Sequence, residues 1–312
     1  MKILPDAINR ILVISLTNLG DVILTTPVMA QLHAAYPHAA ITVLIGPKGR
    51  ELIAGSGTVR EVIVYDKKAN WQDKITLIRQ LRQKHFDLVI DLRNTLIPFL
   101  IQAKRFNFPV FGRQPVAMRA RHLSRLDFLE LPQTKETFEF FNEQDAETCW
   151  RKMKGLNVDR HYGVVVLAPG AGSFEKRWPA ASFGKVGRYF TAQQKQVVVV
   201  GSLAEKELGK QIQEFDPFQI ANACGALTLR ELAAFLKEAD CVVSNDSAIM
   251  HLANEQNVST VALFGPTNPN QYAAYKSGNR VIQAESNLRE ISGISPERVI
   301  KACEDILNAN VH

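Results

Sequence analysis

Short runs of apolar residues alternate with longer amphipathic stretches through the first half of the chain. Continuous apolar runs are typical of parallel strands buried on both faces. Such strands are predicted at 10–16, 41–45, 61–65 and 88–92. Apolar residues at helical spacing predict helices at 22–36 and 72–85, and Pro27 should distort the first turns of the earlier one. Strands that alternate with helices in this way indicate right-handed βαβ units in one parallel sheet.

The same alternation begins again in the second half, after a basic, aperiodic region at 113–135 and a mostly helical connector at 137–156. Strands are predicted at 164–168, 196–200, 241–244 and 260–264. Helices are predicted at 180–191, 227–238, 247–255 and from Pro296 to the end. The 312 residues are therefore expected to form two Rossmann-like, doubly wound α/β domains, 1–156 and 157–312, which face a central cleft. The last helix is expected to pack back toward the N-terminal domain.

Composition narrows the class of protein. Hydrophobic residues at 46% and charged residues at 22% are ordinary for a soluble globular protein. The longest apolar runs are far shorter than the ~20 residues of a membrane helix, and the first ten residues do not resemble a secretory signal, so a cytoplasmic location is expected. The four cysteines form no Cys-x-x-Cys pair, which argues against a zinc site or a disulfide framework. The net charge of +6 favours an anionic partner: nucleic acid, an anionic glycolipid and a membrane surface all fit.

Several common motifs are missing from the sequence. No Gly-x-Gly-x-x-Gly follows the first strand, and no Gly-x-x-x-x-Gly-Lys-Ser/Thr occurs anywhere. A dinucleotide oxidoreductase and a P-loop NTPase are therefore disfavoured. The lack of an Asp-x-Asp triplet also argues against a metal that holds a sugar diphosphate.

The first candidate segment, residues 17–21, joins the first strand to the first helix. Asp21 stands there at the carboxyl edge of the sheet, where ligands of doubly wound folds bind. It could remove a proton from an acceptor hydroxyl. It could equally cap the helix and favour its positive end.

Two further segments follow strand ends in the second domain. Residues 169–173 contain Gly170 and Gly172, which let backbone amides approach an anion, and Lys176 and Arg177 follow within reach. Residues 244–251 lead into a helix N-terminus, where free N–H groups bind anions. Either segment could also be a plain turn or helix cap, but together at one sheet edge they describe a cradle for a nucleotide diphosphate.

Four ordered stretches of the chain resemble the motifs of glycosyltransferase family 9. They are residues 20–27, residues 169–171 with 176–179, residues 245–247 with 251–253, and residues 264–269. The resemblance runs from about the first strand to the last. It implies a GT-B fold and a transferase that moves heptose from ADP-heptose to the inner core of lipopolysaccharide, with inversion of the anomeric centre and without a metal or other cofactor.

The resemblance also implies roles for individual residues. Asp21 would be the general base, and Lys176 would neutralise the leaving diphosphate. Asp246 and the amides of Ser247 and Ala248 would hold the sugar and phosphates, with Thr267 beside them. The remaining donor residues would be Gly170, Ala171, Ser173, His251 and Glu205, which could take the ribose hydroxyls or simply start a surface helix.

The acceptor would bind to the N-terminal half of the chain. The expected acceptor residues are Thr17, Asn18, Gly20, Arg113, Arg119, Arg121 and Arg125. Arginines there could grip phosphates or acidic sugars bidentately, although a mobile charged loop is an equal alternative for any one of them. An anionic glycolipid is the expected partner rather than nucleic acid, and its lipid anchor would allow peripheral contact with the inner membrane.

The chain departs from the family pattern at two places, both expected to lie in the donor site. Ala248 stands where the family has glycine, and Asn254, Glu255 and Gln256 replace an alanine-rich continuation. Three alternatives therefore stay open: a transferase with another nucleotide sugar, a GT-B epimerase, and an inactive nucleotide-sugar-binding protein.

Overall fold

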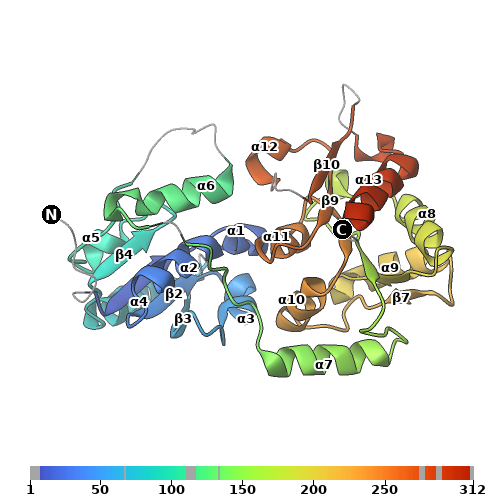
Figure 1. Ribbon diagram of the computed structural model, residues 1–312. Helices are drawn as coiled ribbons and strands as arrows, with labels where there is room; N and C mark the ends of the chain where they lie inside the picture. The colour runs from blue at the N-terminus through green and yellow to red at the C-terminus, as the bar shows by residue number, and fades with distance from the viewer. Residues whose placement is uncertain are drawn as a thin grey trace. The chain divides into compact units, whose positions relative to one another are not determined.

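The computed structural model describes residues 8–66, 68–109, 117–132, 134–273, 278–285 and 290–309. The chain separates into two compact units, Met1–Phe140 and Phe141–His312. Each unit is built around one sheet, and every pairing between its strands is parallel (Figure 1). The predicted α/β class is confirmed.

The sheet of the first unit has four strands in the order β3-β2-β1-β4. Its strands are β1 (Arg10–Ile14), β2 (Ala40–Ile45), β3 (Glu61–Val64) and β4 (Leu88–Asp91). Its longer helices are α2 (Thr26–Ala35), α4 (Trp71–Gln83) and α6 (Met118–Leu123). Three shorter helices are α1 (Leu19–Ile23), α3 (Arg50–Ile53) and α5 (Ile97–Leu100). Two 3-10 helices are η2 (Pro47–Gly49) and η3 (Ser124–Leu129). The central strands β1 and β2 are buried along nearly all of their length, as is typical of parallel strands covered on both faces.

The helix predicted at 22–36 is interrupted just before Pro27, which separates α1 from α2. Proline is tolerated in the first turn of α2 because the N–H that it lacks would have had no helical partner there. The hydroxyls of Thr25 and Thr26 donate to the carbonyls of Val22 (2.6 Å) and Ile23 (2.8 Å). These bonds satisfy backbone groups at the break, so α1 stands as a separate short element that carries Asp21.

The sheet of the second unit has six strands in the order β10-β9-β8-β5-β6-β7. They are β5 (Val164–Ala168), β6 (Gln196–Val199), β7 (Ile220–Asn222), β8 (Cys241–Asn245), β9 (Thr260–Phe264) and β10 (Arg280–Gln283). The order reverses between β5 and β8, and ligands of doubly wound sheets bind at the carboxyl ends of the strands at such a point.

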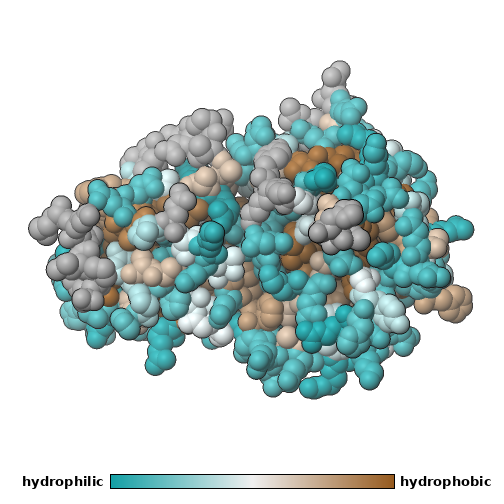
Figure 2. All heavy atoms as spheres, viewed as in Figure 1, coloured by the Kyte–Doolittle hydropathy of each residue, from teal (hydrophilic) through white to brown (hydrophobic). Residues whose placement is uncertain are grey.

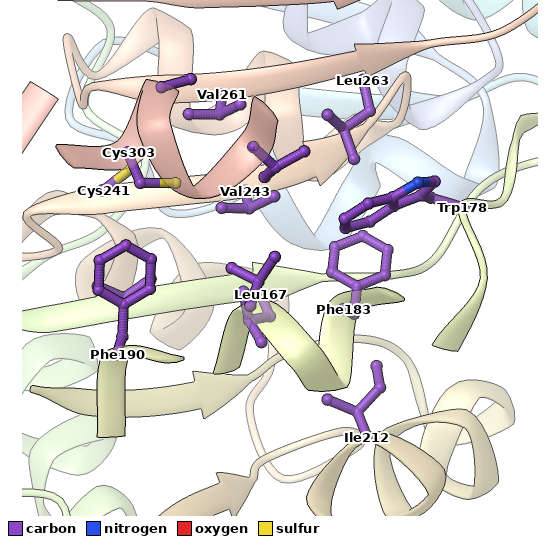
Figure 3. Packing of buried hydrophobic residues seen from close by; sticks show 14 of the residues in the cluster. Leu167, Trp178, Phe183, Phe190, Ile212, Cys241, Val243, Val261, Leu263 and Cys303 are labelled. Atoms are coloured by element: carbon purple, nitrogen blue, oxygen red, sulfur yellow. The ribbon is translucent and has the colours of Figure 1, made fainter. Parts of the chain in front are cut away.

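Helices cover both faces of this sheet (Figure 1). One layer consists of α8 (Ala180–Thr191), α9 (Lys206–Gln213) and α13 (Pro296–Ala309); the other contains α10 (Leu229–Lys237), α11 (Ala248–Glu255) and α7 (Glu143–Lys154), which packs on α10. Short elements η4 (Phe174–Lys176), η5 (Leu203–Glu205), α12 (Pro269–Tyr272) and η6 (Ile291–Gly293) complete the unit. Figure 3 shows the core under the first layer, where Trp178 and Phe183 stack edge to face beside Val243 and Leu263.

One expectation about domain organisation differs from the structure. The units divide after Phe140 and not after residue 156, because α7 packs on α10 and belongs to the second unit. The closing helix α13 buries Val299, Cys303 and Ile306 in the core of the second unit. All four cysteines are free and buried.

Candidate functional site

The two candidate donor segments meet at the carboxyl edge of the second sheet, as predicted. They follow β5 and β8, which pair directly, with Ala168 opposite Ser244. The side chain of Asn245 joins them: its Nδ2 donates to the carbonyl of Pro169 (2.7 Å), and its Oδ1 accepts from the backbone N–H of Trp178 (3.1 Å). Asn245 is completely buried. One side chain therefore fixes both ends of the loop that carries Lys176.

Lys176 and Asp246 form an ion pair within this edge. The Nζ of Lys176 lies 2.7 Å from Oδ2 of Asp246, and their side chains are 29% and 5% exposed. The backbone N–H of Asp246 donates to the carbonyl of Leu263 (3.1 Å), which fixes its loop to β9. Lys176 keeps further N–H donors beyond the one that Asp246 accepts, so an anion could share this lysine or displace the carboxylate.

The N-terminus of α11 lies beside this pair. Ser247 occupies the N-cap position with an extended backbone, but no side chain caps the helix. Its hydroxyl instead bonds to the hydroxyl of Ser244 (3.1 Å). The first amides of α11, including that of Ala248, are thus available to an anion at the positive end of the helix. Within the described chain, Oγ1 of Thr267 is buried without a hydrogen-bond partner.

Glu205 lies against the first donor loop. Its carboxylate accepts from the backbone N–H (2.7 Å) and the hydroxyl (2.9 Å) of Ser202, in a capping box that starts η5. A Cβ built on Gly170 would collide with Oε1 of Glu205, so the carboxylate lies directly against this glycine. The helix-start interpretation of Glu205 is therefore confirmed, and the same carboxylate also faces the donor loop.

The remaining predicted donor residues have mixed surroundings. Ala171 is buried, and its carbonyl accepts from Nη2 of Arg177 (3.2 Å). Ser173 precedes η4 and is half-buried. His251 is buried in α11, with its ring 6.4 Å from that of Tyr272.

The departure at 254–256 does not lie in the donor site, contrary to the prediction. These residues occupy the far end of α11 and are buried. Oδ1 of Asn254 accepts from Oγ1 of Thr260 (2.9 Å), the first residue of β9, and Nε2 of Gln256 donates to the carbonyl of Ala233 (3.1 Å). Only Ala248 stands at the donor edge.

The first unit presents the segment 17–21 at the carboxyl end of β1. Thr17 packs so closely on Gly46 that a Cβ there would lie 2.7 Å from the Thr17 Cα. Asn18 is the N-cap residue of α1, but its Nδ2 donates to Oδ2 of Asp21 (3.2 Å) and its side chain caps no amide. Asp21 is half-buried in the first turn, one residue after Gly20. Its carboxylate is therefore oriented by Asn18 and is not consumed as a helix cap.

Sequence reasoning missed a second carboxylate at this edge. Asp91 ends β4, which pairs with β1, and is buried. Its carboxylate accepts from the backbone N–H groups of Arg93 (2.8 Å) and Thr95 (2.5 Å). The side chain of Asn107 accepts from the backbone N–H of Asp91 and donates to its carbonyl. The signal was available, since Asp91 follows an apolar run just as residues 17–21 do.

The basic segment is ordered over its described part. Arg113 lies outside the described residues, whereas Arg119 and Arg121 are half-buried in α6. Arg125 is 5% exposed and its Nη1 lies 3.4 Å from the carbonyl of Phe108. Burial lowers the pKa of Arg125, as does Arg121 nearby. Arg119, Arg121 and Arg125 thus lie in the helical elements α6 and η3 and not in an irregular loop.

His122 lies among these arginines and is 4% exposed. Burial, and then the charges of Arg121 and Arg125, lower its pKa to about 4. Its Nε2 has no hydrogen-bond partner within the described chain. The first unit thus holds a neutral histidine and a buried guanidinium side by side.

The chain as a whole is similar to proteins of one family. The family model described as glycosyltransferase family 9 (heptosyltransferase) matches residues 98–297. The lipopolysaccharide core heptosyltransferase OpsX of Haemophilus influenzae is 23% identical, over 94% of this chain and 90% of that protein. The family 9 glycosyltransferase of Veillonella parvula superposes with a TM-score of 0.84 at 26% identity, covering 96% of this chain and 97% of that one.

A second solved structure shares the fold of this chain. The ADP-heptose lipopolysaccharide heptosyltransferase II of Escherichia coli superposes with a TM-score of 0.81 at 22% identity, over 97% of this chain and 100% of that one. The predicted GT-B fold is thereby confirmed. Because the family model covers more than half of the sequence, the chain belongs to glycosyltransferase family 9.

Proposed function

We propose that this protein transfers heptose from ADP-heptose to the inner core of lipopolysaccharide. Family membership and the names of the relatives support this reaction. The observation that carries it is the Lys176–Asp246 pair beside the uncapped N-terminus of α11, at the switch point of the second sheet. The ammonium group of Lys176 and the free backbone amides of α11 lie together there, which is an arrangement that binds a diphosphate.

In this proposal the donor displaces an internal contact. Lys176 turns from Asp246 to the diphosphate, and the freed carboxylate accepts hydroxyls of the sugar. The amides of Ser247 and Ala248 bind phosphate oxygens, which the Cβ of Ala248 does not prevent because the amide itself is the ligand. The orphaned hydroxyl of Thr267 gains a partner. Glu205 is the candidate for the ribose, using the oxygen that faces Gly170.

Transfer then proceeds by a single displacement. The acceptor oxygen forms a bond to the anomeric carbon as the bond from that carbon to the diphosphate breaks, which inverts the centre. The acceptor proton passes to Asp21, and the charge that develops on the leaving ADP is neutralised by Lys176. Asn18 holds the Asp21 carboxylate for this step through its bond of 3.2 Å.

The acceptor is proposed to bind to the first unit, at the segment 17–21 and the basic segment. Arg119 and Arg121 supply charge for its anionic groups, and Arg113 is assigned with them from the sequence. The buried Arg125 and His122 support this segment from beneath. We place the enzyme in the cytoplasm, where the acceptor is a lipid-anchored precursor. No helix of the described chain is long and apolar enough to cross a membrane.

Ligand-induced stabilisation tests the donor assignment. The protein is heated with ADP, UDP, GDP, CDP or dTDP, each at ~100 times its dissociation constant, where binding adds roughly 2.7 kcal/mol of stability. Stabilisation by ADP alone is expected. Stabilisation by another diphosphate would keep the transferase and change its donor, and no response at all would favour an inactive homologue. Product analysis without acceptor separates transfer from epimerisation.

A further inference from the structure

The first unit carries a cluster of large apolar side chains on its surface. Four of them are between 50% and 75% exposed: Leu96, Phe99, Leu100 and Phe108, here named the α5 patch. Trp71 (69%) and Ile75 (39%) lie on α4, which contacts α5. Isolated exposed apolar residues are ordinary, but a contiguous group on a soluble domain marks an interaction surface.

The fold holds the α5 patch outward. In the single turn of α5, Ile97 packs on the core and Pro98 is buried, so Leu96, Phe99 and Leu100 must face away from it. Phe106 is partly buried against the same core and supports the rings of Phe99 and Phe108 at centroid distances of 4.8 and 5.6 Å. The packing of this unit therefore holds these apolar side chains at its surface. In the face drawn in Figure 2, tan and brown residues reach the surface among teal ones where Figure 1 shows β4 and α5.

The part of the sequence that carries this patch is net positive. From Trp71 to Pro109 the sequence has seven lysines and arginines against three aspartates and no glutamate. Two of the aspartates are already engaged, since Asp91 is buried and Asp87 pairs with Lys104 at 3.0 Å. Arg79 and Arg82 are exposed along α4, on the same helix as Trp71.

We propose that the α5 patch, with Trp71 and Ile75, is the surface by which the enzyme docks on an anionic lipid leaflet. Apolar side chains flanked by cations match the chemistry of such a surface: the rings enter the boundary between head groups and acyl chains, and the cations meet lipid phosphates. This inference rests on the proposed function, because an acceptor anchored in a bilayer requires an enzyme that works at its surface.

Vesicle binding tests the proposal with the full chain. Vesicles that contain phosphatidylglycerol should co-sediment the protein, and vesicles of phosphatidylcholine alone should do so much less. The double variant Phe99→Ser with Leu100→Ser should bind about tenfold more weakly or worse, since the two half-exposed side chains together contribute at least that factor when they are inserted. Phe218→Ser is the matched control: Phe218 is 98% exposed but belongs to the second unit, and its loss should change nothing.

Fluorescence locates the contact. Brominated phosphatidylglycerol should quench the emission of the wild-type protein. Trp71→Phe should remove most of the quenching, because Trp178 is buried in the core and Trp150 is half-buried in the second unit. Wild-type protein that ignores anionic vesicles, or a double variant that binds them equally well, would overturn the proposal. A wild-type dimer that the double variant converts to a monomer would assign the patch to a second copy instead.

A second readout separates this inference from the proposed function. The double variant should transfer heptose normally to a soluble, deacylated acceptor and poorly to one embedded in vesicles. Vesicle binding without transfer to either acceptor would refute the proposed function and leave the docking surface standing. Equal transfer by both proteins to the embedded acceptor would refute the docking surface alone.

Discussion

The side chain of Asn245 offers the sharpest test of how the donor edge is assembled. Replacing it with alanine removes two buried hydrogen bonds, of 2.7 and 3.1 Å, and leaves the carbonyl of Pro169 and the N–H of Trp178 without partners. A buried group left unsatisfied costs about 1–3 kcal/mol, so the variant should lose about 3 kcal/mol of stability. For a unit of this size that is a fall in Tm of about 6–12 °C.

Asn222→Ala is the matched control for this variant. Asn222 also bridges two backbone groups, accepting from Cys224 N–H (3.1 Å) and donating to the carbonyl of Lys206 (3.2 Å), but it is half-buried at the edge strand β7. Water can replace its bonds, and a loss of about 1 kcal/mol is expected.

Calorimetry measures the stability of both variants, and titration with ADP measures their affinity for the nucleotide. Asn245→Ala should weaken ADP binding as well as stability, because the Lys176 loop loses its tie, whereas Asn222→Ala should leave ADP affinity unchanged. If Asn245→Ala had the Tm of the wild type and bound ADP equally well, Asn245 would not be the residue that positions this loop.

Three further predictions address other parts of the account. Asp21→Ala should abolish heptose transfer while ADP binding, followed by calorimetry, stays unchanged; normal turnover would remove Asp21 as the base. Lys176→Ala should weaken ADP binding and turnover together, and should also lower stability because the buried Asp246 loses its cation; unaltered kinetics would exclude the phosphate role. His122 binds its proton near pH 4 in the folded protein and near 6.5 when unfolded, so stability should fall as pH drops from about 6.5 to 4, by up to about 1.4 kcal/mol per pH unit. Urea unfolding of wild type and His122→Gln at pH 5.5 and 7 measures that slope, which the variant should reduce; identical slopes would contradict the assignment.

The sequence predicted all four strands of the first sheet and the four inner strands of the second, but it missed the two edge strands of the second sheet. β5 is apolar along its whole length and β1 is apolar after Arg10, as is typical of parallel strands buried on both faces. The edge strands β7 and β10 were missed: they are short, partly exposed and mixed in composition, so no run or alternation marks them.

The candidate site was predictable where a motif follows a strand. Residues 169–173 and 244–251 were expected at one edge, and the pairing of β5 with β8 places them there. The contact between Lys176 and Asp246 could not be predicted, because the two lie far apart in sequence and only the fold brings them together. Residues 254–256 were wrongly assigned to the donor site because they closely follow the donor motif in the sequence. They lie at the far end of α11, which at about 1.5 Å per residue is roughly 10 Å from its N-terminus.

Direct observation of the transferred sugar tests whether the protein is a heptosyltransferase. Purified protein is incubated with ADP-heptose and a heptose-free lipopolysaccharide core, and the mass of the acceptor is measured together with released ADP. One added heptose per acceptor, in step with released ADP, is expected for the wild type and none for Asp21→Ala. ADP-heptose that is bound but never consumed, or ADP released by water without any gain in acceptor mass, would refute heptose transfer by this protein.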